Sequence, residues 1–159
     1  MTASQDDYAE DLATAYLDAG RLDEAIPLLE RTFTDSRRAL GDIHPDTVTA
    51  RNTLAFVYLA AGRLDEAIPL YERNLADREH SLGHTHPSVL TFRNSLASVY
   101  KKAGRLDEAI ALYERTLAER ERTLGGAHPH TLITRSNLAD AYENAGQLDK
   151  AQRLRDLAS

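Results

Sequence analysis

The stretch GRLDEA at residues 62–67 is a repeated motif, because the same six residues begin again at Gly20 and at Gly104. A degenerate copy, GQLDKA, begins at Gly146, and successive copies are 42 residues apart. A Leu-Gly pair and a His-Pro pair keep the same register, and residues 41–82 and 83–124 are identical at 27 of 42 aligned positions. Three markers in one register predict a repeat architecture over the whole chain.

Each period is typical of two helices. In the period that begins at Gly41, Pro45 marks the first helical position and Gly62 a left-handed helix end. Leu54, Ala55 and Tyr58 form an apolar stripe between them. The sequence therefore predicts helices over residues 5–19, 22–40, 45–61, 64–82, 87–103, 106–124, 129–145 and 148–157.

One helical hairpin cannot bury its apolar face alone, whereas stacked hairpins can. We therefore expect an all-α fold, an α-solenoid of four helical hairpins (eight antiparallel helices) forming a right-handed crescent. It would be a single domain over residues 1–159, with units of about 1–40, 41–82, 83–124 and 125–159.

Composition excludes several classes of protein. The 159 residues include no cysteine, so neither a disulfide framework nor a thiolate metal site is available. No apolar run approaches the roughly 20 residues that span a bilayer. The net charge of −6 argues against nucleic-acid binding. We expect a cytoplasmic protein with no membrane contact.

The repeat unit resembles the tetratricopeptide repeat in its long, 42-residue, kinesin-light-chain-like form. Leu54, Ala55, Tyr58 and Gly62 carry the resemblance, with Ala67 and Tyr71 in the second helix, and the match extends over all four units. The resemblance implies that the first helices line a concave groove that binds peptides or partner helices. In bacteria such arrays are often attached to signalling ATPase domains, and this sequence contains no GxxxxGK[ST] loop.

The repeat phase assigns candidate groove residues on the first helices. Asn52 and Asn94 lie two residues before the stripe leucine, and an amide there could bracket a ligand backbone. Grooves of the kinesin-light-chain kind carry asparagines at this point, so the resemblance supports both; solvated packing is the alternative. The further candidates on the same faces are Phe56, Ser98, Lys101, Lys102 and Asp140.

Arg51, Arg93 and Arg135 form a second ladder, three residues before each stripe leucine. They could bind an acidic ligand as a row of cations. Alternatively each stem packs between hairpins while its head pairs with an acidic residue on the preceding second helix. The shared face with Leu54 and Tyr58 favours the second interpretation.

Charge is uneven along the chain. Residues 1–40 carry nine acidic and four basic side chains, whereas residues 83–124 carry five and seven. This asymmetry could steer the acidic part of a ligand toward Lys101 and Lys102, or support head-to-tail self-association. A solvated surface without consequence is the third possibility.

No catalytic constellation, cofactor motif or metal site is predicted. The ladder of His44, His86 and His128 is one hairpin apart, too far for one ion. Each histidine precedes a helix-starting proline and is expected to hydrogen-bond the loop. We therefore expect no enzyme but a protein–protein interaction scaffold, a monomer or weak dimer, holding a protein or peptide ligand in its groove. The alternative is a self-assembly module that uses the solenoid end faces.

Overall fold

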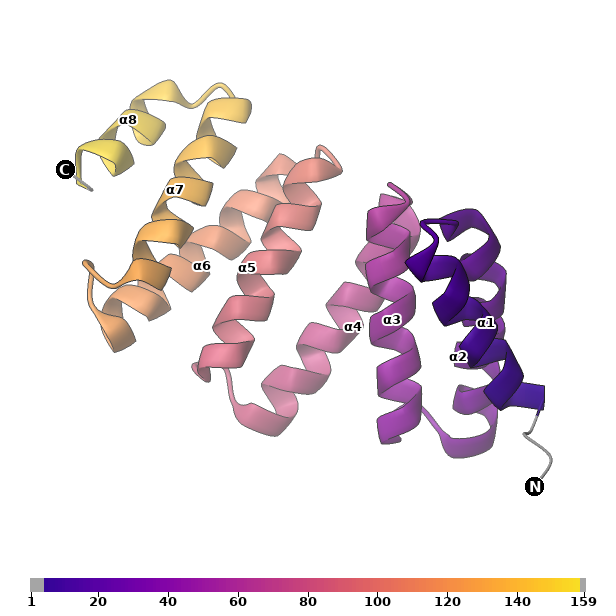
Figure 1. Cartoon of the computed structure of the whole chain (residues 1–159). Helices are drawn as coiled ribbons and strands as arrows, with labels where there is room; N and C mark the ends of the chain where they lie inside the picture. The colour runs from indigo at the N-terminus through magenta and orange to yellow at the C-terminus, as the bar shows by residue number, and fades with distance from the viewer. Residues whose placement is uncertain (1–4, 158–159) are drawn as a thin grey trace. The chain divides into compact units, whose positions relative to one another are not determined.

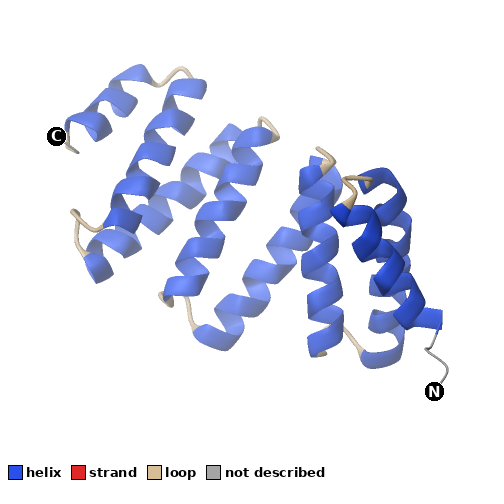
Figure 2. Cartoon of the chain, in the orientation of Figure 1, coloured by secondary structure: helices blue, strands red, loops and turns tan. Residues whose placement is uncertain are grey.

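The computed structural model describes residues 5–157, and the side chains from residue 12 onward. Figure 2 shows helices joined by short loops, with no strand in the described part of the chain. The helices are α1 (Gln5–Asp18), α2 (Leu22–Leu40), α3 (Pro45–Ala60), α4 (Leu64–Leu82), α5 (Pro87–Lys102), α6 (Leu106–Leu124), α7 (Pro129–Asn144) and α8 (Leu148–Asp156). Every bound lies within one residue of its prediction, so the all-α repeat fold is confirmed.

The helices form two compact units, residues 1–74 and 75–159, which divide within α4. In the first unit α2 packs against both α1 and α3. In the second unit α6 packs against α5 and α7, α8 packs against α7, and α5 also contacts α7 (Figure 1). A single domain over residues 1–159 stays a prediction.

Glycine ends the helices where the sequence indicates. The N–H of Gly62 bonds to Leu59 O (3.1 Å) and the N–H of Arg63 bonds to Tyr58 O (2.8 Å). These two bonds are the Schellman pattern, which requires a left-handed residue between them. Gly62 has φ +72°, and Gly83 after α4 has φ +84°, conformations that cost other residues energy.

The arginine of GRLDEA explains more of the motif than the sequence reasoning found. The Arg63 guanidinium lies 4.8 Å from the ring centroid of Tyr58, and its Nη2 lies 2.7 Å from Glu66 Oε1. The side chain thus clamps the end of one helix to the start of the next. The same trio recurs in the first and third copies of the motif, at Tyr16, Arg21, Glu24 and at Tyr100, Arg105, Glu108.

The His-Pro pairs mark the starts of α3, α5 and α7, where each histidine is the N-cap residue. The Nδ1 of His86 accepts a hydrogen bond from the N–H of Ser88 at 3.2 Å, and Pro87 occupies the first position of α5. A side-chain acceptor here satisfies one of the donors that a helix leaves unpaired at its start. His44 and His128 cap α3 and α7 in the same way.

Small and aromatic side chains alternate in the core of each unit. In the first unit Leu54, Tyr58 and Ala67 are buried together. In the second unit Leu138, Tyr142 and Ala151 occupy the equivalent positions two periods later. The fully buried alanines allow neighbouring helices to approach closely while the tyrosines fill the remaining space.

Candidate functional site

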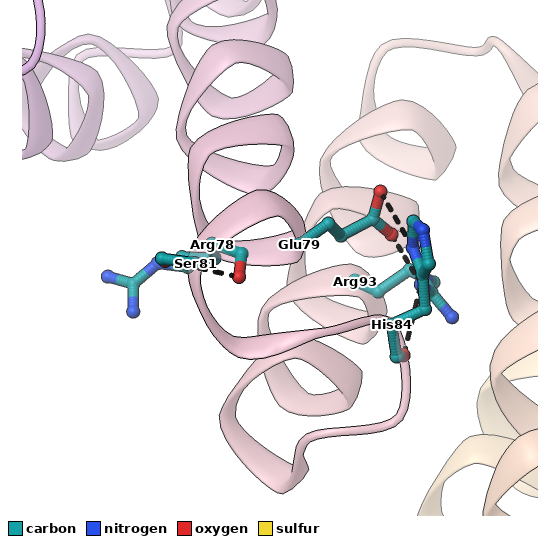
Figure 3. Close-up of polar contacts among 5 residues, drawn as sticks. All are labelled: Arg78, Glu79, Ser81, His84 and Arg93. Atoms are coloured by element: carbon teal, nitrogen blue, oxygen red, sulfur yellow. Dashed lines mark hydrogen bonds and ion pairs between the residues drawn. The ribbon is translucent and has the colours of Figure 1, made fainter.

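Arg93 of α5 is completely buried and forms an ion pair with Glu79 of α4. Its Nη2 donates to Glu79 Oε1 and, at 3.3 Å, to the carbonyl oxygen of His84. The His84 ring adds a contact of 3.4 Å from Nδ1 to Glu79 Oε2 (Figure 3). Burial alone would raise the pKa of Glu79. The hydrogen bond and the positive charge of Arg93 lower this pKa by more than burial raises it, so the pKa of Glu79 is below its usual value.

Arg135 of α7 makes the same contact one period later. Its Nη2 lies 2.8 Å from Glu121 Oε1 on α6, and its Nη1 donates to Leu157 O at 3.3 Å. Arg51 of α3 is also buried. The two pairs have the geometry of the packing alternative, in which each head meets an acidic residue on the preceding second helix.

Asn94 lies half-buried on the α5 face that neighbours α7. Its Oδ1 is 3.2 Å from the hydroxyl oxygen of Thr134 on α7. Ser98 is half-buried one turn further along, and it is followed by the half-buried Lys101 and the exposed Lys102. Ser98 lies four residues after Asn94, and Lys101 and Lys102 lie three and four residues after Ser98, which places these side chains on one face of α5.

The remaining predicted residues lie in different surroundings. Asp140 of α7 is half-buried, and its Oδ1 is 3.4 Å from Arg155 Nη2 of α8. Asn52 is half-buried on α3, and Phe56 beside it is 64% exposed. Asn52 and Phe56 belong to the first unit, whereas the other seven predicted site residues belong to the second. The structure therefore groups Asn94, Ser98 and the two lysines on one helix.

Sequence reasoning missed one buried cation behind this face. Arg120 of α6 inserts its guanidinium between α5 and α7, where Nη1 donates to Thr134 Oγ1 (2.6 Å) and to His130 O (2.9 Å). Its Nη2 donates to Thr91 Oγ1 of α5 at 3.2 Å. The sequence signal for this residue was weak. An arginine, Arg78, lies one period earlier, but the first copy of the repeat has Ser36 at this position.

Two negative observations concern sites of other kinds. Within residues 5–157 no helix combines the length and apolar character needed to cross a membrane. No group of three His, Cys, Asp or Glu side chains with metal-binding geometry occurs among the described residues.

Comparison with known proteins identifies the repeat. The model of the tetratricopeptide repeat family matches residues 7–79, 46–118 and 88–154. A crystal structure of nearly identical TPR-like repeats from a candidate kinesin light chain of Podosopora anserina is similar, with 33% identity and a TM-score of 0.83. The match covers 99% of this chain and 74% of that one. A substituted form of that protein matches with a TM-score of 0.81 and the same identity and coverage.

A third similar structure is BtubC (BKLC) from P. vanneervenii, with 26% identity and a TM-score of 0.73. The match covers 92% of this chain and 59% of that one. No curated protein matches the chain. Family match and structural likeness agree over residues 7–154, so the chain belongs to the tetratricopeptide repeat family, whose repeats are typically non-enzymatic scaffolds for protein–protein interaction.

Proposed function

We propose that the chain is a scaffold that binds an extended peptide or a partner helix in a groove, and that the α5 face with Asn94 and Ser98 lines this groove in the second unit. The observation that carries the proposal is the row of Asn94, Ser98, Lys101 and Lys102 on one helix face, beside α7. Asn94 Oδ1 accepts a hydrogen bond from Thr134, so its NH2 group is the part of the amide that would donate to a ligand carbonyl. Pre-orientation of this kind reduces the entropy that binding would otherwise cost.

The lysines give the face its charge preference. Lys101 and Lys102 lie in the last turn of α5, and the segment from residue 83 to 124 carries more basic than acidic side chains. An acidic part of the ligand is therefore drawn toward this end of the helix. Asp140 on α7 accepts a hydrogen bond from Arg155 on α8. We propose that Asp140 is the acidic side chain of the binding face, as the two lysines are its basic side chains.

Asn52 and Phe56 have the same proposed role on α3 of the first unit. Phe56 is 64% exposed, and its aromatic side chain supports a contact role because aromatic side chains are enriched in protein interfaces. Asn52 supplies an amide two residues before the stripe leucine, as Asn94 does on α5. The two helices offer the same kind of contact in separate units.

Arg93 and Arg135 contribute to binding as positioning residues. Their guanidinium groups are engaged by Glu79 and Glu121 beneath the helices that carry the proposed contacts. They hold α5 and α7 against the second helix of the preceding hairpin, which keeps the ligand-facing side chains in place.

Partner capture from the source cell tests the proposal. Wild type, the variant Asn52→Ala with Asn94→Ala, and the control Arg115→Ala are compared, since Arg115 is exposed on the second helix α6. The affinity of each recovered partner is then measured by calorimetry. The double variant should weaken binding about tenfold or more, because each lost pair of amide hydrogen bonds is worth on the order of 1 kcal/mol. The control should bind as wild type does.

Self-assembly predicts a different outcome. Light scattering would give a mass that rises with protein concentration, and the asparagine substitutions would leave both that mass and partner recovery unchanged. Circular dichroism of the double variant checks that the fold is intact, because Asn94→Ala removes the contact with Thr134. Equal partner affinity for wild type and the folded double variant would overturn the groove proposal.

A further inference from the structure

A hollow of about 740 Å³ lies in the second unit, where the end of α6 meets the starts of α5 and α7. Two arginines line it, Arg78 and Arg120, together with the polar side chains of Thr91 and His130. Among the residues that the structure describes, no Asp or Glu lines this hollow. It is therefore a positively charged hollow in a chain whose net charge is −6.

Arg120 is the buried member of the pair, with an exposed fraction of 3%. Its three hydrogen bonds all go to neutral oxygens, those of Thr91, Thr134 and His130. In the part of the chain with described side chains, no carboxylate pairs with Arg120, and burial lowers the pKa of its guanidinium. Burying a cation without a counter-charge is costly, so this site is incomplete as it stands.

Arg78 approaches the same hollow from α4. Its guanidinium lies 4.8 Å from the ring centroid of Phe92, and it points away from the cluster of Glu79 and Arg93 (Figure 3). Arg78 and Arg120 occupy the same position in successive repeats. Two arginines from successive second helices, α4 and α6, therefore line one hollow.

The equivalent hollow of the first unit shows that the repeat does not need this cation. It has a volume of about 530 Å³ between α1, α2 and α3. Ser36 occupies the position of Arg78 and Arg120, and Asp46 adds a carboxylate at the rim. The helices pack around Ser36 as well as around Arg120, so the cation is a local property of the second unit.

We propose that this hollow binds a carboxylate of a partner peptide, an acidic side chain or a chain end, with Arg120 as the buried anchor and Arg78 as the second donor. The proposal rests on the proposed function and names the chemistry of one subsite. Thr91 and Ser95 line the hollow and share the α5 face of Ser98, so it opens along the proposed binding face.

A carboxylate fits this hollow better than a phosphate does. Arg120 has five N–H donors and already commits hydrogen bonds to three protein oxygens. The remaining donors suit the two oxygens of a planar carboxylate. Leu90, Phe92 and Leu124 also line the hollow and can cover the methylene groups of an acidic side chain.

The probe is N-acetyl-glutamate methylamide, titrated into the ¹⁵N-labelled full chain at constant ionic strength. Its neutral isostere, N-acetyl-glutamine methylamide, and inorganic phosphate are the comparison arms. We expect saturable shifts of the Thr91 and His130 amides with the glutamate probe, with a dissociation constant on the order of millimolar for so small a ligand. The glutamine probe should bind about tenfold more weakly or not measurably, because it lacks the charge-assisted hydrogen bonds.

Three variants locate the response. Arg120→Gln should weaken the glutamate probe about tenfold, and Arg78→Gln should weaken it by a smaller factor. Arg122→Gln is the matched control, because Arg122 lies on the same helix, is 64% exposed and pairs with Glu119. It should bind the probe as wild type does. Spectra of each variant show whether it is folded, and Arg78→Gln carries the test if Arg120→Gln is not.

Four results would overturn the assignment. They are equal binding of the glutamate and glutamine probes, no saturable binding of the glutamate probe, an equal loss in Arg122→Gln, and phosphate binding about tenfold tighter than the carboxylate. The groove proposal fails separately. If the probe binds through Arg120 while the asparagine variants still capture partners fully, the carboxylate site is supported and the proposed ligand contacts of Asn52 and Asn94 are contradicted.

Discussion

Replacing Glu79 by glutamine should destabilise the second unit far more than replacing Glu121 by glutamine. Arg93 has no exposed surface, and its Nε and Nη1 have no hydrogen-bond partner among the residues with described side chains, so Glu79 is its counter-charge. Breaking a buried ion pair by removing one charge costs about 3–5 kcal/mol of unfolding free energy. The glutamine of Glu79→Gln can still accept a hydrogen bond from Arg93, so we expect a loss at the lower end, about 3 kcal/mol. Glu121 is 44% exposed, so solvent screens its pair with Arg135 and the expected loss is below about 1 kcal/mol.

Thermal unfolding followed by circular dichroism measures both variants in the full chain. A loss of about 3 kcal/mol lowers the melting temperature by roughly 6–12 °C in a chain of this size, against about 2–4 °C or less for Glu121→Gln. Equal shifts for the two variants, or a larger one for Glu121→Gln, would refute the reasoning from burial.

The pH dependence of the same pair gives an independent check. The pKa of Glu79 is lower in the folded chain than the ordinary value of about 4.3, although burial alone would raise it. A carboxyl group whose pKa is lower in the folded than in the unfolded state stabilises the fold at pH values above its unfolded pKa. This contribution is lost as the pH falls through the folded pKa. The stability difference between wild type and Glu79→Gln should therefore narrow below about pH 4.

Three further substitutions test the helix ends and the interhelical contacts. Gly62→Ala should lower the free energy of unfolding, measured by thermal unfolding, by about 1–2 kcal/mol because φ is +72° at this position. A loss below about 0.3 kcal/mol would contradict the assignment of Gly62 as a left-handed helix cap. His86→Ala should cost about 0.5–2 kcal/mol while His86→Asn restores most of it, as Asn is a good N-cap. Burial and then the hydrogen bond to Glu30 (2.5 Å) raise the pKa of Tyr58 to about 12, above the ordinary value of about 10. The stabilising contribution of the Tyr58 phenol is therefore complete below about pH 10 and lost toward about pH 12, a loss that Tyr58→Phe should abolish.

The periodicity predicted the helices because each helix end has its own local chemistry. Gly62 marks a left-handed residue and Pro45 a first helical position, and both effects act within one turn of the chain. The apolar stripe containing Leu54 and Tyr58 indicates the buried face by the same local logic. These features need no knowledge of neighbouring hairpins, which is why the bounds agree to one residue.

Side-chain pairing was less predictable, because it depends on which residues meet across hairpins. The sequence indicated an acidic partner for Arg93 on the preceding helix, but it did not single out Glu79 among the acids of α4. It gave no indication that Arg120 reaches between α5 and α7, since that depends on the length and direction of a side chain from the helix behind. The Tyr58–Arg63 contact lies within one hairpin, and it was missed because it depends on the direction that the arginine side chain takes over the ring.

Repetition alone does not separate structural from functional arginines in this chain. Arg93 and Arg120 are both buried, and both recur with the period of the repeat. They differ in what lies next to the guanidinium, a carboxylate from Glu79 for one and three neutral oxygens for the other. The repeat also folds with Ser36 at the position of Arg120, so the fold does not require this cation. Because Arg120 is buried without a carboxylate beside it in the described part of the chain, a ligand that supplies one would complete the site, as proposed above.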